Sequence, residues 1–598
     1  MLATMVAALL LGQPTGTKPP NIILVVADDL GARDLGFSGS TFHKTPNLDK
    51  LAARSAVFTQ AYSACPVCSP SRAGLLTGQN PARLHLTDWI PGQAPKPTQP
   101  LRRPNDEQAL PKGTPTLPRL LKENGYATYH VGKWHLGGKG SSPTDHGFDI
   151  NIAGDQSGSP KSHFAPFQSG NGGPMPGLEK AMPGEYLTDR LNSESRRLIK
   201  SHMQKDNNRP FFLHLSHFAP HTPLQAPEDL IAKFPGTPSP GRQSNPIYAA
   251  MIASIDDGIG RLMETLEQLR ISENTVIVFT SDNGGLCTTE GPNTPATYNG
   301  PFREGKGYLY EGGIRVPLII SLPKKEKGIR DTQPAWGPDL TPTLAQISGL
   351  KNVPFAVDGV SLLERAKGDT TETASRTLAW HYPHYSNQGG RPGGVWREGP
   401  WKLIEFYETG RKELFHLERD PGENNNLAPN EAQRVAEMAA RLEAWRKEAN
   451  VQTMTPTPNY MPNPPGPRGI ITLHGKTAQV TGKMLRFEPL PHKQTLGYWV
   501  VKEDAAWWEF TLEKPGEYQV EILQGCGNGS GGSELEISVG DQKVIHKVFE
   551  TGGFQEFRPF VAGNIKLDGP GKKRLDLKAL SKPGAAVGDV RQIRLLPQ

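Results

Sequence analysis

The chain is poor in cysteine and has no long run of one charge. Its 598 residues include four cysteines, which are too few for a disulfide scaffold in a chain of this length. The 66 Lys and Arg residues nearly balance the 60 Asp and Glu residues, and without a basic run the sequence does not indicate nucleic-acid binding. Beyond its first residues, no segment is apolar enough to span a membrane.

The first twelve residues, MLATMVAALLLG, have the apolarity and length of the core of a signal peptide. They are too few to cross a bilayer as a helix. No Lys or Arg precedes Lys18, although signal peptides usually begin with a positive charge. We expect residues 1–16 to be a signal peptide and the protein to be exported, to a periplasm or outside the cell. The alternative is an apolar tail without this role.

Glycine and proline are abundant, with 65 and 56 residues, and they predict many loops and turns. The chain also exceeds the usual size of a single hydrophobic core, which favours a large catalytic unit with smaller appended modules. Active sites are commonly built on loops that a rigid scaffold positions. The composition therefore fits a multidomain enzyme with a loop-built site.

Five apolar runs of strand length alternate with polar turns and helical stretches. They lie at residues 21–27, 126–131, 211–216, 276–280 and 316–321. The runs are almost continuously apolar, as parallel strands covered on both faces should be. Residues 248–269 have apolar side chains at helical spacing and predict a crossover helix. We therefore expect an α/β fold with a mostly parallel sheet between helices, over residues 17–370.

From about Asp369 the segments become shorter and alternate between apolar and polar residues. We expect a small antiparallel sheet and a helix at 430–449 within a subdomain of residues 371–450, and a semi-rigid Pro-rich linker at 451–468. Short strands then predict a β-sandwich over residues 469–598. Carbohydrate binding and bracing of the catalytic domain are both open for this module. Its aromatic residues Tyr498, Trp499, Trp507 and Trp508 could stack on sugars, although such residues are more often core.

Two of the apolar runs end in pairs of oxygen-bearing side chains. Asp28 and Asp29 follow the first run, and Asp282 and Asn283 follow the fourth. Ligands of open α/β sheets bind outside the carboxyl ends of the strands, so these pairs should meet at one edge. Such a set of oxygens favours a hard cation, calcium rather than zinc. Each pair alone could instead begin a turn or cap a helix.

The segment CPVCSPSRAGLLTG, residues 65–78, predicts a helix with a nucleophile at its start. Ser69 is the expected N-cap, Pro70 the first helical residue and Gly78 the stop. Cys68 would then lie where unpaired N–H groups favour an anion, and Arg72 adds a donor fork for sulfate or phosphate oxygens. The pattern Cys-x-x-Cys also occurs in redox proteins, but here it lacks their βαβ context.

This segment resembles the signature of the formylglycine-dependent sulfatases of the alkaline phosphatase superfamily, Cys-x-Pro-Ser-Arg followed after three residues by Leu-Thr-Gly. The matching residues are Cys68, Pro70, Ser71, Arg72, Leu76, Thr77 and Gly78. Further family segments are GKWHLG at 132–137, HGFD at 146–149, APHTP at 219–223 and GKGYLYEGGIRVP at 305–317. The resemblance covers roughly residues 20–450. Within the family, the chain resembles arylsulfatase-like polysaccharide sulfatases with a C-terminal β-sandwich module.

The resemblance implies an alkaline-phosphatase-like fold and a sulfatase activity with a specific set of residues. Cys68 would be converted to formylglycine by a formylglycine-generating or an anaerobic sulfatase-maturing enzyme. The implied calcium ligands are Asp28, Asp29, Asp282, Asn283 and an oxygen of the modified residue 68. The implied catalytic groups are Arg72 and Lys133 at formylglycine and substrate oxygens, His135 as the base, and His221 with Lys306 at the leaving-group oxygen.

Two other functions remain open at this point. One is hydrolysis of phosphate or phosphonate monoesters, because related enzymes share the architecture and the metal site. The other is a non-catalytic carbohydrate-binding protein that keeps the fold. As substrate we expect a sulfated oligosaccharide or polysaccharide, with His384, Asn387 and Arg391 as contacts and residues 85–89 as a second wall. These polar residues could also merely join loops together.

Overall fold

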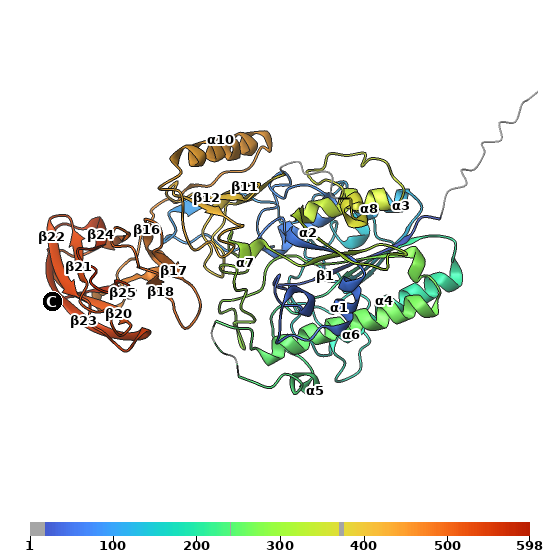
Figure 1. The fold of residues 1–598 in the computed structure, drawn as a ribbon, viewed down its shortest axis with the longest axis horizontal. Helices are drawn as coiled ribbons and strands as arrows, with labels where there is room; N and C mark the ends of the chain where they lie inside the picture. Colours follow the sequence, from blue (N-terminus) through green and yellow to red (C-terminus); the bar gives the residue numbers. More distant parts are fainter. Residues whose placement is uncertain (1–17, 238, 240, 370–375) are drawn as a thin grey trace, which may run out of the picture.

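The computed structural model describes residues 18–237, 239, 241–369 and 376–598. The predicted signal peptide, residues 1–16, and the predicted boundary at residue 370 lie outside these residues. Figure 1 shows a large α/β unit, a small sheet with helix α10 (Ala432–Glu448) beside it, and an all-β unit at one end that carries the C-terminus. None of the helices in the described chain is both long and apolar enough to cross a membrane.

Eight strands form the central sheet of the α/β unit. In spatial order they are β5 (Ile150–Ile152), β4 (Ala127–Gly132), β6 (Phe211–Ser216), β1 (Asn21–Ala27), β7 (Thr275–Ser281), β8 (Leu318–Ser321), β2 (Ala56–Tyr62) and β9 (Ile329–Trp336). The first five of these strands run parallel to one another. The predicted mostly parallel sheet between helices is confirmed.

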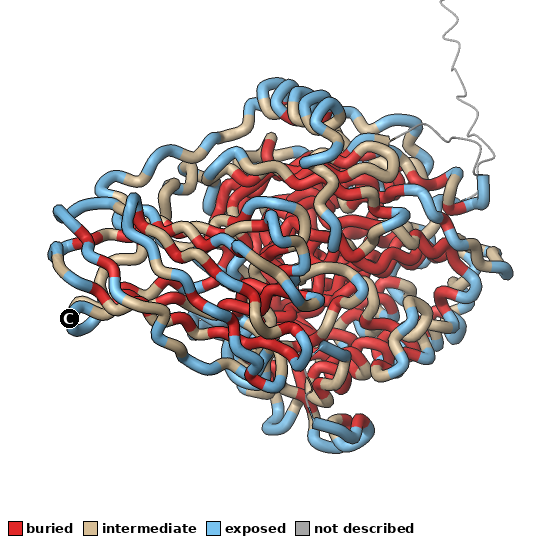
Figure 2. The backbone as a smooth tube through the Cα atoms, turned by 60° about the vertical axis from the view of Figure 1, so that its left-hand side comes forward, coloured by how far each residue is buried: buried red, intermediate tan, exposed pale blue. Residues whose placement is uncertain are grey.

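Helices cover both faces of this sheet, which explains why its strands are apolar at every position. Ile23 and Val25 of β1 face one core, and Ile22 and Leu24 face the other. The first core lies under α1 (Pro46–Ala53), α4 (Leu187–Lys205), α5 (Glu228–Ile231) and α6 (Pro246–Gln268), and the second under α2 (Cys68–Thr77), α3 (Leu117–Glu123), α8 (Leu340–Ile347) and α9 (Leu363–Lys367). Figure 1 shows the two helix layers above and below the strands, and Figure 2 shows buried chain concentrated between them.

The predicted strands agree with β1, β6, β4 and β7 within about one residue at each end. The fifth run was expected to be parallel, and this is wrong, because β8 pairs antiparallel with β7 and with β2. After β7 the chain forms a long loop and the short helix α7 (Glu311–Ile314) at the carboxyl edge of the sheet. It therefore enters β8 from that edge and runs back.

Helix α6 is the crossover between β6 and β7 that the sequence predicts. It begins two residues before the predicted start, at Pro246, because Asn245 caps it: Asn245 Oδ1 accepts from the N–H groups of Ile247 (3.1 Å) and Tyr248 (3.2 Å). Its apolar face packs on the first core. The crossover therefore joins the two strands that flank β1 in the sheet.

The C-terminal part contains three antiparallel sheets. The small sheet consists of β10 (Thr377–Tyr382), β11 (Gly393–Glu398), β12 (Trp401–Phe406) and β13 (Lys412–His416). The sandwich has β17 (Arg486–Glu488), β18 (Thr495–Gly497), β25 (Asp589–Pro597), β20 (Gly516–Cys526), β23 (Gly553–Leu567) and β15 (Ile471–His474) in one sheet, and β16 (Gln479–Thr481), β19 (Ala505–Leu512), β24 (Gly571–Ala579), β21 (Glu534–Val539) and β22 (Gln542–Lys547) in the other. Helix α10 covers the small sheet through Met438.

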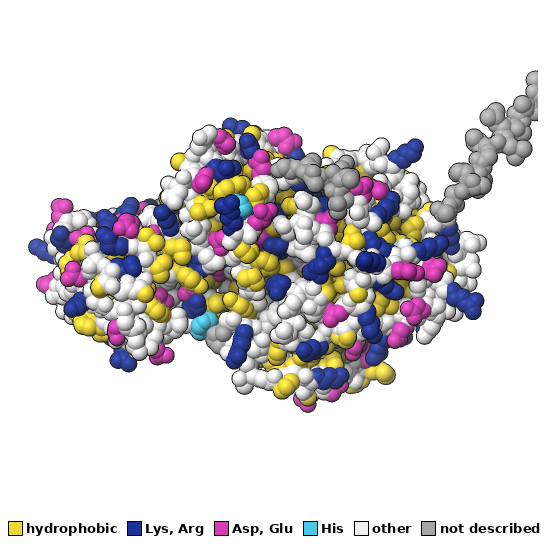
Figure 3. All heavy atoms as spheres, viewed as in Figure 1, with side chains coloured by type: hydrophobic (Ala, Val, Ile, Leu, Met, Phe, Trp, Pro, Cys, Tyr) yellow, Lys and Arg dark blue, Asp and Glu magenta, His cyan; other side chains and the backbone are white. Residues whose placement is uncertain are grey.

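The Pro-rich segment between these parts lies against the catalytic unit. Its strand β14 (Thr455–Pro456) pairs with β3 (Leu101–Arg102), and the N–H of Met461 donates to the carbonyl of Pro97 (2.9 Å). In the sandwich, Trp499 and Trp508 are core residues, whereas Tyr498 is exposed and Trp507 is half-buried. Figure 3 shows basic and acidic side chains interspersed over one face of the molecule.

Candidate active site

The side chains that follow β1 and β7 lie together because these strands are parallel neighbours. Ala27 pairs with Ser281 at the ends of the two strands, so Asp28 follows one strand beside Asp282 on the other. The N–H of Asp29 donates to Asp282 Oδ1 (3.2 Å), and Asn283 Nδ2 donates to Asp29 Oδ1 (2.7 Å). All four side chains are buried. The predicted oxygen ligands therefore form one buried cluster at the carboxyl edge of the sheet.

This cluster fits a hard divalent cation. Oδ1 of Asn283 is buried and has no hydrogen-bond partner among the described residues. Burial raises the pKa of Asp28 well above its ordinary value, an effect larger than the opposing attraction of Lys133. Side-chain ligand atoms of Asp28, Asp29, Cys68 and His221 lie within 4.8 Å of one another. A buried oxygen without a donor and a carboxylate short of positive charge are what a bound cation would satisfy.

Each of the three carboxylates of the cluster forms an ion pair with a cationic side chain. The pairs are Lys133 Nζ with Asp28 Oδ2 (2.7 Å), Arg72 Nη2 with Asp282 Oδ2 (2.7 Å) and Lys306 Nζ with Asp29 Oδ2 (2.8 Å). Burial alone would raise the pKa of Asp29, but Lys306 and His221 outweigh it and bring that pKa to about 2. Counted as fully ionised groups, the three cations balance the three carboxylates, and a divalent cation would make the cluster an attractive site for an anion.

Cys68 is the first residue of helix α2. Val67, in an extended conformation, precedes the helix, and Gly78 ends it in the left-handed region with φ 71°. The expected roles of Ser69 as N-cap and Pro70 as first helical residue are wrong, because the helix begins at Cys68, two residues before Pro70. Ser69 Oγ instead accepts from the N–H of Ile90 (3.1 Å). Cys68 is only 3% exposed, and burial raises the pKa of its thiol to about 12.

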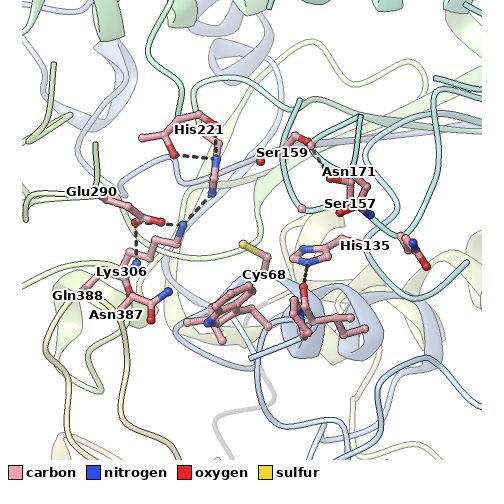
Figure 4. Close-up of a pocket in the computed structure, with 18 of the residues that line it drawn as sticks. Cys68, His135, Ser157, Ser159, Asn171, His221, Glu290, Lys306, Asn387 and Gln388 are labelled. Carbon is pink, nitrogen blue, oxygen red and sulfur yellow. Dashed lines mark hydrogen bonds and ion pairs between the residues drawn. The ribbon is translucent and has the colours of Figure 1, made fainter. Parts of the chain in front are cut away.

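A cavity of about 610 Å³ opens at the start of α2. Cys68, His135, His221 and Lys306 line it, and Figure 4 shows them around the same space. Of the six predicted catalytic residues, these four reach the cavity. Arg72 and Lys133 are held by the carboxylates, and Arg72 Nη1 also donates to Ser216 Oγ (2.5 Å) and to the carbonyl of Lys133 (3.2 Å). These two cations therefore position the oxygen cluster.

His135 is held as a neutral base. Its Nε2 lies 2.8 Å from the carbonyl of Ile90, an acceptor, so Nε2 carries the proton and Nδ1 does not. Within the described chain, the buried Nδ1 has no hydrogen-bond partner. Burial, together with Lys133 and Arg72, lowers the pKa of His135 well below its ordinary value. The ring is therefore neutral, and its Nδ1 keeps a free lone pair that can accept a hydrogen bond.

His221 and Lys306 share one hydrogen bond at the opposite side of the cavity. His221 Nδ1 donates to the carbonyl of Thr222 (2.7 Å), so Nε2 accepts from the ammonium of Lys306 (2.9 Å). Burial and then Lys306 lower the pKa of His221 to about 4, whereas Asp29 and Glu290 raise the pKa of Lys306 against the effect of burial. Lys306 is therefore charged and His221 neutral, and the ammonium is the protonated member of the pair beside the cavity.

Of the three predicted substrate contacts, one lines the catalytic cavity and two lie elsewhere. Asn387 lines the cavity, where its Oδ1 accepts from Gln93 Nε2 (2.8 Å). His384 is buried, with Nε2 2.8 Å from Thr87 Oγ1 and Nδ1 3.6 Å from Asp88, and it does not line this cavity in the described chain. Arg391 also lies outside the described lining and binds Glu408.

The sequence reasoning missed several lining residues. Ser157, Ser159 and Asn171 form one wall, and Trp89, from the predicted second wall, contributes to another. Glu290 accepts from Gln388 Nε2 (2.6 Å) and lies 3.7 Å from Lys306. All of these except Trp89 come from Gly- and polar-rich stretches, whose composition is that of any surface turn.

Comparison with known protein families gives two matches. The model of the family described as Sulfatase matches residues 20–350, and that described as N-sulphoglucosamine sulphohydrolase, C-terminal, matches residues 303–448. Among curated proteins, N-acetylgalactosamine-6-sulfatase of Canis lupus familiaris is 34% identical over 462 residues, covering 70% of this chain and 83% of its own length. A sulfatase of Formosa agariphila is 30% identical over 512 residues, covering 73% and 90%.

Solved structures agree with these matches. Ps i-CgsB in complex with k-i-k-neocarrahexaose is similar with a TM-score of 0.60 and 29% identity, covering 71% of this chain and 92% of that chain. The phosphonate monoester hydrolase of Agrobacterium radiobacter has a TM-score of 0.53 at 20% identity, covering 72% and 96%, which shows a shared fold alone. With this fold and these matches, the chain belongs to the sulfatase family and is a sulfatase of the alkaline phosphatase superfamily.

Proposed function

We propose that this sulfatase removes sulfate from a sulfated carbohydrate, with a formylglycine made from Cys68 and a bound calcium ion. One observation carries the proposal. Residue 68 lies at the start of a helix in the same cavity as His135, His221 and Lys306, and it adjoins a buried cluster of oxygen ligands. A nucleophile, a base, a proton source and a cation site thus converge on one space.

Two properties of Cys68 support its conversion. A thiol with a pKa raised to about 12 is protonated at neutral pH and is a weak nucleophile. Sulfur is also a poor ligand for a hard cation. The hydrated aldehyde would supply one hydroxyl to attack sulfur, a second to release sulfate, and an oxygen in place of Sγ. Since Cys68 is 3% exposed, the formylglycine-generating or anaerobic maturing enzyme must reach it before the chain folds.

The calcium ion would be held by Asp28, Asp29, Asp282 and Asn283. When bound, it supplies positive charge that stabilises the negative oxygens of the transferring group. Arg72 and Lys133 keep Asp282 and Asp28 in place through short ion pairs. The net charge of the site would rise from zero to two, which favours a sulfate ester over a neutral molecule.

The two histidines divide the proton transfers. His135, with Nδ1 free of a described partner and Nε2 held by the Ile90 carbonyl, accepts the proton that must leave residue 68. His221 and Lys306 face the leaving-group oxygen and give it a proton, directly from the ammonium or through His221 Nε2. This arrangement, with a neutral histidine accepting from a charged lysine, suits donation toward a developing alkoxide.

A carbohydrate as substrate is supported by the relatives and by the cavity. One relative is named for N-acetylgalactosamine 6-sulfate, and a similar structure contains a neocarrahexaose. Asn387, Ser157, Ser159 and Asn171 supply hydrogen-bonding groups suited to sugar hydroxyls. Such polymers are found outside cells, so this substrate agrees with our proposal that the protein is exported.

The test is a panel of sulfate esters with matched controls. Chondroitin 6-sulfate and carrageenan oligosaccharides are assayed for released sulfate beside an aryl sulfate, an aryl phosphate and an aryl phosphonate. We expect desulfation of at least one saccharide, sulfate release faster than phosphate release, loss of activity in Cys68→Ala, and loss on chelation with recovery by calcium. Faster turnover of the phosphorus esters would refute the assignment to sulfate.

A further inference from the structure

A second cavity, of about 530 Å³, lies where the sandwich meets the small sheet β10–β13. Its walls come from the loop before β3, from the loop after β10, and from the sandwich strands β16 and β19 with their neighbouring loops. Asn387 lines both this cavity and the catalytic one. The two cavities are therefore adjacent, and Asn387, which accepts a hydrogen bond from Gln93 Nε2 (2.8 Å), lies at their boundary.

Arg391 builds the wall between the two domains. Its Nη1 pairs with Glu408 of the catalytic part (3.2 Å), and its Nη2 donates to the carbonyls of Lys476 (3.0 Å) and Ala478 (2.5 Å) in the sandwich. Tyr385 also donates to Glu408 (3.0 Å). These charge-assisted hydrogen bonds join the catalytic part to the sandwich and hold the walls of the cavity in place. Arg391, predicted from the sequence as a substrate contact, thus serves as the tie that holds this wall.

The lining combines an aromatic surface with cations and amides. Trp507 of β19 is half-buried and lines the cavity. The guanidinium of Arg574 packs on one face of its ring, 4.3 Å from the centroid, which leaves only the other face for a ligand. Lys96 and Lys476 line it from opposite domains and are exposed. Gln93 and Gln99 add amide groups from the loop before β3. An aromatic face, point charges and amides suit the ring, the sulfates and the hydroxyls of a sulfated sugar.

The charge of the lining agrees with an anionic ligand. The basic side chains are Lys96, Arg391 and Lys476, and the acidic ones are Glu408 and Glu509, so the balance is one positive charge. Arg391 and Glu408 neutralise each other, because they form an ion pair at 3.2 Å. The two exposed lysines and Glu509 therefore remain, so a ligand would meet a balance of one positive charge.

We propose that this second cavity binds the part of a sulfated polysaccharide chain that flanks the sugar in the catalytic cavity. The inference rests on the proposed function, namely that the scissile ester belongs to a sulfated carbohydrate. The sandwich is then part of the substrate site. It extends the catalytic cavity, and the enzyme acts faster on a chain than on an isolated repeat unit.

Two variants with matched controls test the proposal in the full-length enzyme. Trp507→Ala removes the aromatic surface, and Lys476→Gln removes one cation without touching the buried structure, since Lys476 is exposed. The controls are Phe549→Ala and Lys566→Gln, an exposed aromatic residue and an exposed lysine of the sandwich that are not part of the described lining. Each enzyme is assayed on the disaccharide and hexasaccharide of chondroitin 6-sulfate and of carrageenan, with an aryl sulfate as internal reference.

The wild-type enzyme and both controls should turn over the hexasaccharide with kcat/KM about tenfold above the disaccharide, relative to the aryl sulfate, and Trp507→Ala and Lys476→Gln should remove most of this advantage. If both variants keep the preference of the wild-type enzyme, or if the wild-type enzyme has none, the second cavity does not bind the chain and the proposed function stands. If no saccharide is desulfated while the aryl sulfate is, the proposed function fails and the inference fails with it.

Discussion

Replacing Lys306 by Met should separate the two tasks of this lysine, one structural and one chemical. Lys306 is 5% exposed and Asp29, its partner at 2.8 Å, is 1% exposed. Removing the ammonium leaves a buried carboxylate without that partner, so we expect a loss of about 3–5 kcal/mol in unfolding free energy. Calcium should restore part of this loss, because Asp29 is a proposed ligand.

The chemical effect should exceed what lost stability explains. Lys306 faces the leaving group, so kcat/KM per folded molecule should fall by about 10²–10³-fold. The pKa of His221, lowered to about 4 by burial and next by Lys306, should rise when the lysine is absent. With Lys306 absent, His221 itself must carry the proton for the leaving group, so activity should fall as the pH rises through the pKa of His221. Steady-state kinetics from pH 4 to 8, with the folded fraction measured by circular dichroism, check both expectations.

Lys402→Met is the matched control. Lys402 is fully buried and pairs with Glu311 (3.0 Å) and Glu423 (2.8 Å), apart from the described lining of the catalytic cavity. Its loss should cost stability of the same order. Its activity per folded molecule and its pH profile should stay those of the wild-type enzyme. An unchanged kcat/KM in Lys306→Met, or an equal loss in both variants, would refute the reasoning.

Two further outcomes follow from the buried groups. Asn283→Leu removes the unpartnered oxygen and should weaken calcium binding at least about tenfold, measured as the calcium dependence of the thermal midpoint; an unchanged dependence would contradict the metal site. Burial lowers the pKa of His130, His163 and His217 to about 3. As the pH decreases below about 6.5, these histidines take up protons in the unfolded chain but not in the folded one, so the free energy of unfolding decreases. Each histidine should cost roughly 2 kcal/mol at pH 5, and urea unfolding free energies equal at pH 8 and pH 5 would exclude this.

The sequence was sufficient where local pattern and chemistry coincide. The run at 21–27 is apolar at every position because both faces of β1 are covered, and Asp28 follows it at the edge where ligands bind. The same holds for β7 and Asp282. Here the composition predicts a strand, and the position of its carboxyl end predicts the site.

Other elements depend on contacts that composition does not encode. Strand β9 contains Asp331 and Pro334 because it is an edge strand, and its sequence was not recognised as part of the sheet. The direction of β8 depends on the path of the preceding loop. The substrate contacts predicted at His384 and Arg391 stay predictions: His384 bonds to Thr87 outside the described lining of the catalytic cavity, and Arg391 pairs with Glu408 in the lining of the second cavity. Only the three-dimensional arrangement shows whether such a residue lines a cavity or holds neighbouring segments in place.

The central claim is that residue 68 acts as formylglycine. Mass spectrometry of the tryptic peptide that contains it, taken from active enzyme produced with a maturing enzyme, measures this directly. The account predicts an aldehyde or its hydrate at position 68, in a fraction that rises in proportion to specific activity. Fully active enzyme that carries only the Cys68 thiol would contradict it.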